Sequence, residues 1–273
     1  MPNISKGLII IVGITLIVIL FIYMAFYFLQ DRILFFPQGI TDGRTSEIQT
    51  EYSNVEEVTL RVDDEISLHG WYIKNEKEPS SPLLIYFGGN AEEVSHLMDS
   101  VTNISTHSVV LINYRGYGKS TGSPGEAAMF SDALAIYDYM AEKTEINKER
   151  ISVMGRSMGT GVAVYLAAER EIDHVILVSP YDSLVNVARD RYPFVPVSLL
   201  LKHRFENIDR APQIESPLLM YIASEDTLIP PAHSERLAEH WKGNNEVIYF
   251  EGYDHNNIQT SNRYWDGIME FLE

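Results

Sequence analysis

The chain has 273 residues, enough for one large α/β domain or two small ones, and its 45% hydrophobic content supports a substantial core. Its formal net charge of -17 argues against nucleic acid as a partner, and charge alone would not bring the protein to an anionic membrane. The sequence contains no cysteine, which excludes disulfides, thiolate metal sites and cysteine nucleophiles.

Residues 7–29 form an uncharged apolar run that is long enough to cross a hydrocarbon core of about 30 Å as a helix. Aromatic residues crowd its C-terminal end, where an aromatic belt would lie. A cleaved signal peptide would have a shorter apolar core and small residues at the cleavage site, whereas bulky Gln30, Asp31 and Arg32 follow here. We therefore predict an uncleaved transmembrane anchor, with a cleaved signal or a buried core helix as the alternatives.

The charges that flank this anchor are nearly balanced, with Lys6 and the amino terminus before it and Arg32 and Arg44 after it. A short amino-terminal segment before a long apolar run is typical of a signal-anchor. We therefore predict that the amino terminus lies inside and that the bulk of the chain is extracytoplasmic.

Residues 30–54 are predicted to form a juxtamembrane linker, polar and irregular from residue 38 onward, and residues 55–273 a single domain. The runs 55–62 and 66–73 alternate around an acidic turn, which predicts a β-hairpin. Short, predominantly apolar runs then alternate with helical patterns, as in a mostly parallel sheet with helices on both faces. The predicted strands are 83–87, 109–113, 151–154, 175–178, 218–222 and 247–250, and the predicted helices are 126–142, 158–170, 234–241 and 262–271.

A G-x-S-x-G motif, Gly155-Arg156-Ser157-Met158-Gly159, lies between the predicted strand 151–154 and the predicted helix that follows it. In this strand–turn–helix setting the glycines permit a sharp turn without a side-chain clash. The Ser157 hydroxyl would then lie exposed at a helix amino terminus, which favours developing negative charge. The alternative is a chance glycine-rich turn, but the flanking strand and helix favour a nucleophile.

A serine nucleophile needs a base and a group that orients the base, and in this kind of fold the acid precedes the histidine. Asp226 follows the predicted strand 218–222 and His255 follows 247–250, so both lie at the strand-end edge that carries Ser157. Glu225 and Asp182 are the rival acids. The other histidines follow no late strand and are interpreted as surface or packing residues: 69, 96, 107, 174, 203, 233 and 240.

Acyl transfer also needs backbone N–H donors at the developing oxyanion. One candidate is the N–H of Met158, directly after the nucleophile. The other should come from the loop after strand 83–87, Gly88-Gly89-Asn90-Ala91, whose glycines allow a close backbone approach. We assign this second donor to Asn90, with Ala91 as the alternative and an ordinary turn as the simpler interpretation.

Residues 181–213 break the strand–helix rhythm, because they are too long for a tight connection and have an apolar pattern of their own. We predict a small helical cap that leaves the sheet at the edge carrying Ser157. Phe194 and Leu200 belong to more apolar surface than a solvated loop needs, so we expect the cap to cover Ser157 and select substrates. The alternative is that these residues only pack the cap onto the sheet.

These motifs together resemble the α/β-hydrolase superfamily, and within it the membrane-anchored, small-capped hydrolases of the serine aminopeptidase-like subgroup. The resemblance covers roughly residues 30–270 and implies an α/β-hydrolase fold with a Ser157, Asp226 and His255 triad. Gly88 departs from the pattern, because this family usually has a histidine there that supports the oxyanion loop. The segments that carry the resemblance are Leu34–Pro37, Gly88–Ala91, Asn113–Gly122, Gly155–Gly159, Pro180–Leu184 and Asp226–Pro230, with the final His255.

The expected activity is that of a membrane-anchored serine hydrolase which cleaves an ester, thioester or related acyl bond and needs no cofactor or metal. The expected partner is a small-molecule or lipid-linked acyl substrate, because the anchor holds the site near a bilayer. A serine peptidase on the same triad is the first alternative, and a non-catalytic binding module with a hydrolase fold is the second.

Overall fold

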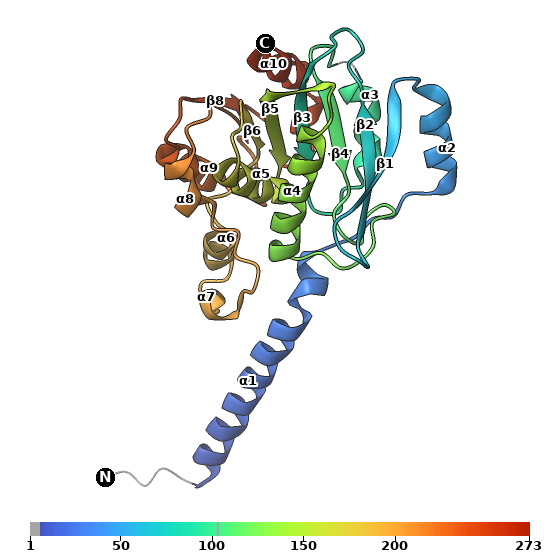
Figure 1. Cartoon of the computed structure of the whole chain (residues 1–273). Coiled ribbons are helices and arrows are strands. Elements are labelled where there is room, and N and C mark those ends of the chain that lie inside the picture. Colours follow the sequence, from blue (N-terminus) through green and yellow to red (C-terminus); the bar gives the residue numbers. More distant parts are fainter. Residues whose placement is uncertain (1–5, 103) are drawn as a thin grey trace.

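The computed structural model describes residues 6–102 and 104–273. The amino-terminal group, one of the two positive charges before the apolar segment, lies outside the described residues. Within them the strands form one sheet in the order β1-β2-β4-β3-β5-β6-β7-β8 (Figure 1). The first two pairs in this order are antiparallel and every later pair is parallel, which confirms the predicted hairpin and the mostly parallel sheet. The bounds are β1 Val55–Arg61, β2 Ser67–Ile73, β3 Ser81–Phe87, β4 Ser108–Ile112, β5 Ile146–Arg156, β6 Val175–Val178, β7 Leu218–Ala223 and β8 Asn245–Phe250.

The central strands are buried on both faces, which is why they read as continuous apolar runs. Successive side chains of β3 show the two faces directly, because a strand alternates its side chains with a period of two. Leu83 and Ile85 belong to one buried apolar cluster, and Leu84 and Tyr86 belong to the other. The sheet therefore separates two cores that share one set of strands.

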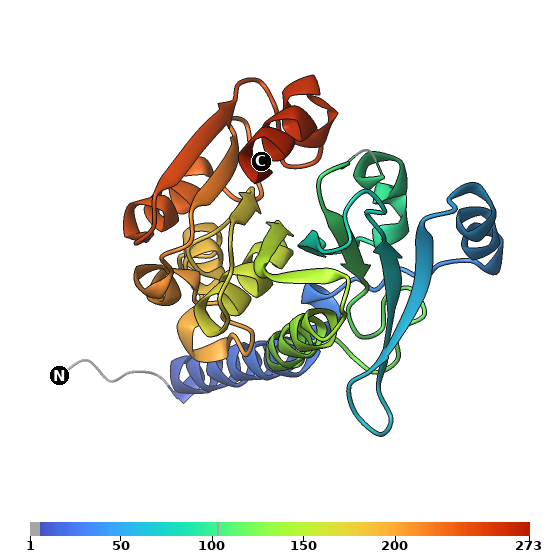
Figure 2. The same cartoon turned by 45° about the horizontal axis from the view of Figure 1, so that its top comes forward.

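Each core is covered by its own helices (Figure 2). The first core contains side chains of α4, α5 and α9, and the second contains side chains of α2, α3 and α10. These layers confirm the predicted helices on both faces of the sheet. The bounds are α2 Asp42–Glu51, η1 Val94–Leu97, α3 Met98–Val101, α4 Glu126–Ala141, α5 Met158–Glu169, α9 Pro231–His240, η3 Ile258–Thr260 and α10 Asn262–Leu272.

Helix α2 corrects the prediction that the chain is irregular between residues 38 and 54. The Thr41 side chain caps it by accepting a hydrogen bond from the Arg44 N–H at 3.2 Å. Ile48 is fully buried in the same cluster as Trp71. The domain core therefore includes this helix, and the prediction was wrong because one buried apolar side chain in ten residues leaves almost no helical periodicity.

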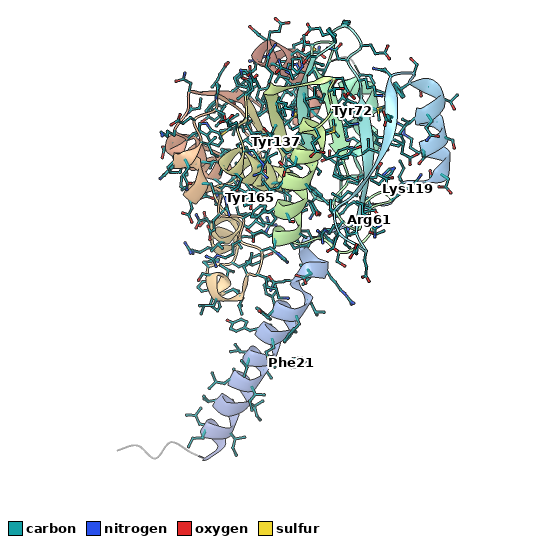
Figure 3. All side chains as sticks on the ribbon, viewed as in Figure 1. Phe21, Arg61, Tyr72, Lys119, Tyr137 and Tyr165 are labelled. Atoms are coloured by element: carbon teal, nitrogen blue, oxygen red, sulfur yellow. The ribbon has the colours of Figure 1, made fainter. Side chains whose placement is uncertain are left out.

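Helix α1 (Lys6–Leu34) extends from the domain as one continuous helix (Figure 1). Its stretch from Gly7 to Leu34 is long and apolar enough to span a membrane, and the most apolar window is not buried by the rest of the molecule. Side chains such as Phe21 point away from the domain (Figure 3). The helix continues five residues beyond the predicted end at residue 29, and in that extension Gln30 is buried.

The segment 181–213 forms the predicted small helical cap, with α6 Leu184–Arg191, α7 Val197–Leu200, α8 Asn207–Arg210 and η2 Ala211–Gln213. It packs between α1 and α5. Phe205 anchors its inner side, because this ring is fully buried and makes an edge contact with Phe130 of α4. Figure 1 shows α7 at the tip of the domain, on the side from which α1 extends.

Candidate active site

The turn between β5 and α5 holds Ser157 in an unusual backbone conformation. Its φ is +50° and its ψ is -117°, which a side-chain-bearing residue rarely adopts and which costs conformational energy. The two motif glycines are required by close contacts. A Cβ on Gly159 would lie 2.1 Å from the carbonyl oxygen of Phe87, and one on Gly155 would lie 2.5 Å from the carbonyl oxygen of Gly159. Strand, turn and helix therefore meet in a way that only glycine permits at both positions.

Ser157, His255 and Asp226 form a continuous hydrogen-bonded series. The Ser157 Oγ lies 2.8 Å from His255 Nε2, and His255 Nδ1 lies 2.7 Å from Asp226 Oδ2. The second carboxylate oxygen, Oδ1, accepts hydrogen bonds from the N–H groups of Leu228 and Ile229, at 2.9 and 2.8 Å, which fix its orientation. With Nδ1 protonated toward Asp226, the imidazole presents Nε2 as an acceptor for the serine hydroxyl.

The elements place these three groups where parallel strands end. Asp226 follows β7 and His255 follows β8, and both side chains are almost completely buried, while Ser157 is half-buried. A buried carboxylate beside a buried imidazole fixes the ring and stabilises it when it becomes charged. The geometry therefore suits a serine that loses its proton to a histidine.

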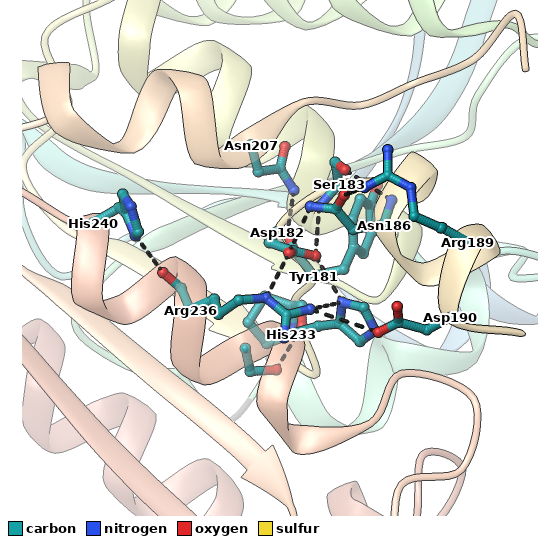
Figure 4. Close-up of polar contacts among 12 residues, drawn as sticks. Tyr181, Asp182, Ser183, Asn186, Arg189, Asp190, Asn207, His233, Arg236 and His240 are labelled. Carbon is teal, nitrogen blue, oxygen red and sulfur yellow. Dashed lines mark hydrogen bonds and ion pairs between the residues drawn. The ribbon is translucent and has the colours of Figure 1, made fainter. Parts of the chain in front are cut away.

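The rival acids lie elsewhere. Asp182 accepts hydrogen bonds from His233 Nδ1 at 2.8 Å and Arg236 Nε at 2.9 Å, and so joins the cap to α9 (Figure 4). Glu225, the other rival acid, has an exposed side chain, and its N–H donates to the Tyr253 carbonyl at 2.9 Å. Asp226 is thus the acid that contacts His255.

The loop after β3 adjoins the nucleophile turn, because Gly159 packs against the carbonyl oxygens of Phe87 and Gly88. The structure therefore places Met158 and the Asn90 loop on adjoining turns. Ala91, the alternative donor, has a positive φ of 56° that bends the loop. The Asn90 side chain links this loop to the end of α1, because its Nδ2 donates to the Leu34 carbonyl at 2.6 Å.

A buried ion pair that the sequence analysis missed holds these turns together. Arg156 Nη1 lies 3.3 Å from Glu92 Oε2, which also accepts from the Gly89 N–H at 2.6 Å. Arg156 Nη2 donates to the His255 carbonyl at 3.0 Å. Burial alone would lower the pKa of Arg156, but the Glu92 carboxylate raises it, so the guanidinium stays charged. The second position of the G-x-S-x-G motif, Arg156, thus connects the loops of the site.

Similarity to known proteins agrees with this architecture. Residues 82–207 match the family described as alpha/beta hydrolase fold. An uncharacterized membrane protein of Saccharomyces cerevisiae is 30% identical, with 90% of this chain and 89% of that protein covered. Protein bem46 of Schizosaccharomyces pombe is 26% identical over 95% of this chain and 91% of its own length. The esterase Pf2001 of Pyrococcus furiosus matches with a TM-score of 0.66 at 22% identity, covering 86% of this chain and 97% of its own. The chain belongs to the α/β-hydrolase superfamily.

Proposed function

We propose that the protein is a membrane-anchored serine hydrolase that cleaves carboxylic esters or thioesters. The observation that carries this proposal is the hydrogen-bonded series Asp226–His255–Ser157, at 2.7 and 2.8 Å, on a strained strand-to-helix turn. A strained turn at a buried site is the place where a reactive serine is expected. The superfamily and the esterases among the structural neighbours support a hydrolase.

In this mechanism the Ser157 Oγ attacks the carbonyl carbon while His255 Nε2 takes its proton. The tetrahedral oxyanion is assigned to the backbone N–H groups of Met158 and Asn90. Its collapse breaks the bond to the leaving alcohol or thiol, which receives the proton from His255. Water then attacks the acyl carbonyl carbon while His255 takes its proton; the bond to Ser157 Oγ breaks, His255 returns the proton to Ser157 Oγ, and the carboxylic acid leaves. Asp226 orients His255 throughout and stabilises the imidazolium without taking its proton.

We further propose that residues 7–29 span a membrane and that the hydrolase domain lies outside the cytoplasm. The apolar side chains of α1 are exposed along its length, which water disfavours and a bilayer satisfies. A helix of this length and composition supports an anchor, as does a relative named a membrane protein. The anchor would hold Ser157 near lipid-linked acyl substrates.

The experiment that tests the catalytic assignment compares Ser157→Ala with Ser179→Ala. Ser179 is a matched control, because it follows the neighbouring strand β6 and also has a positive φ, of 47°. We expect the Ser157 change to lower kcat by about a million-fold and to abolish labelling by a fluorophosphonate. The control should keep both. Labelling of another serine, or hydrolysis by the Ser157→Ala variant at the wild-type rate, would refute the assignment.

A further inference from the structure

An apolar groove lies between the last turns of α1 and the cap. Its volume is about 250 Å³. The α1 side is formed by Phe26, Ile33 and Leu34, and the cap side includes Val187 and Ala188 of α6. A groove of this size lies just below the usual range of ligand sites, about 300–1,000 Å³, and suits a slender apolar group.

Polar contacts at its edges show that the groove is a built feature. Gln30 Nε2 donates to the Leu200 carbonyl at 3.0 Å, and its Oε1 accepts from the Lys202 N–H at 2.8 Å. The His203 ring lies 2.8 Å from the Asp31 carboxylate, which adds a second link between cap and α1. These bonds satisfy the backbone polar groups of the cap at the groove. The walls are thus fixed, and their inner surface stays apolar.

Hydrogen bonds join each wall of the groove to a turn that adjoins the nucleophile. On the α1 side, the Leu34 carbonyl accepts the 2.6 Å bond from Asn90, in the loop assigned to the oxyanion. On the cap side, the lining residue Leu184 comes three positions after Tyr181, and the Tyr181 hydroxyl donates to the Met158 carbonyl at 3.3 Å. Both walls are therefore held close to turns that adjoin Ser157.

The groove is also continuous with the exposed apolar surface of α1. Beside it, the cap exposes Phe194 to 94% and Leu199 to 81%, and α7 points along the side from which α1 extends (Figure 1). Large apolar side chains exposed in this way mark contact with a membrane or a partner. The cap also differs from the rest of the chain in charge. Residues 181–213 carry five basic and four acidic side chains, a net charge of +1, whereas the rest of the chain carries -18. The cap thus lacks the net negative charge of the rest of the chain, which an anionic lipid surface would repel.

We propose that this groove binds one fatty acyl chain of a lipid-linked substrate, which enters sideways from the bilayer with its carbonyl at Ser157. The occupant is an acyl chain because the groove is apolar, narrow, and open to the surface where lipid hydrocarbon would surround α1. The inference rests on the proposed hydrolase function and names its substrate class. The headgroup, alcohol or thiol would remain on the polar side of His255.

The first test measures chain-length selectivity with the full chain in phosphatidylcholine vesicles and a series of acyl thioesters from butanoyl to palmitoyl. Each methylene that enters the groove should raise kcat/KM about fourfold until the groove is filled. Ala188→Phe fills the groove and should lower the palmitoyl-to-butanoyl ratio of kcat/KM at least tenfold. Ala168→Phe is the matched control, because Ala168 is a half-buried alanine of α5 beside a different surface hollow, and it should keep the ratio.

The second test does not depend on turnover. The Ser157→Ala chain in the same vesicles is irradiated with a diazirine-bearing fatty acid, and the modified peptides are mapped by mass spectrometry. We expect adducts on residues 184–191, and we expect Ala188→Phe added to this background to remove them while Ala168→Phe does not. Adducts on α1 alone would reflect ordinary lipid contact and would overturn the groove as an acyl site.

The two proposals fail in distinguishable ways. If the fluorophosphonate labels Ser157 but chain length has no effect on kcat/KM, the groove proposal is wrong and the hydrolase function stands. If Ser157 is not labelled, the hydrolase function itself is wrong. Should Ala188→Phe fail to fold, Leu201→Ala removes wall surface instead and should lower the palmitoyl-to-butanoyl ratio about fivefold.

Discussion

Glu92 is the carboxylate that connects the loop after β3 to the nucleophile turn. One of its oxygens accepts from the Tyr86 hydroxyl at 2.6 Å, and the other binds Arg156 and the Gly89 N–H. A buried ion pair is costly unless its remaining donors and acceptors are satisfied, and here they are. Because Gly88 offers no side chain, the support for the loop assigned to the oxyanion comes from this carboxylate, through the Gly89 N–H.

Replacing Glu92 with Gln should therefore impair catalysis more than binding. The amide keeps the shape but removes the charge that orders Arg156 and Gly89. We expect kcat to fall about 10- to 100-fold with little change in KM, because a small misplacement of the loop weakens transition-state contacts. Glu47→Gln, at an exposed carboxylate paired with Arg44, is the control and should leave both constants unchanged. A wild-type kcat in the Glu92 variant would show that the loop does not need this carboxylate.

Ser157, Asp226 and His255 could be located in the sequence because parallel strands bring their ends to one edge, so each residue only had to follow the correct strand. Glu92 and Arg156 could not be paired in the same way. They lie 64 positions apart, and a chain with 38 acidic and 21 basic residues offers many equally plausible pairs. The only signal was a charged residue, Arg156, inside the G-x-S-x-G motif, and its ion-pair partner becomes evident only in the folded structure.

Among the elements, the join between the cap and α9 is centred on a buried carboxylate, Asp182 (Figure 4). Asp182 is fully buried and also accepts hydrogen bonds from the Ser183 N–H and the Asn186 amide, both at 2.8 Å. Burial alone would raise the pKa of Asp182, but the bonds from His233, Arg236 and Asn186 outweigh it and lower the pKa to about 2. The cap is therefore held by an anion that stays charged in acid.

This lowered pKa predicts how the stability of the cap depends on pH. The folded carboxyl binds its proton less readily than the unfolded one, whose reference pKa is 3.8. Its stabilising contribution is therefore complete above about pH 4 and is lost as pH falls through 2, a change of about 2 kcal/mol.

Urea unfolding of the wild type and of Asp182→Asn in detergent, between pH 7 and pH 2, measures this contribution. The difference in unfolding free energy should be constant above pH 4 and should narrow by about 2 kcal/mol below it. Asp209→Asn, at an exposed position in the same cap, should follow the wild type at every pH. A difference that does not change with pH would mean that Asp182 is not a charged anchor.

The same comparison of elements shows what periodicity can and cannot predict. Strands such as β6, four residues all buried, match their apolar runs at both ends. Helix α2 was missed because it packs on the domain through few side chains, while its cap at Thr41 is a signal that also occurs in loops. A strand that is buried on both faces has a continuous apolar sequence, which is easy to recognise. A helix held by single contacts has no such pattern.

At the scale of the whole molecule, the end of α1 is bonded directly to the loop beside Ser157. Asn90 bonds the backbone at the end of α1, through the Leu34 carbonyl and the Phe36 N–H, at 2.6 and 3.1 Å. Any tilt of α1 in a bilayer would therefore act on the loop assigned to the oxyanion. The sequence predicted the apolar segment and the loop separately. The contact between Asn90 and Leu34 joins positions 56 residues apart and is evident only in the folded structure.

The final prediction is that residues 7–29 remain in the mature protein and hold it in the membrane. The most apolar window of α1 is not buried by the rest of the described residues, so its transfer from water to lipid is strongly favoured. After carbonate washing, the protein should stay in the pellet, with an intact mass that includes the segment. Asp at both Ile17 and Phe21 would cost about 5–7 kcal/mol in the bilayer centre and should release part of the protein, whereas Leu at both positions should not. A soluble protein that starts near residue 30 would identify the segment as a cleaved signal, and an acyl chain could then no longer reach Ser157 along α1.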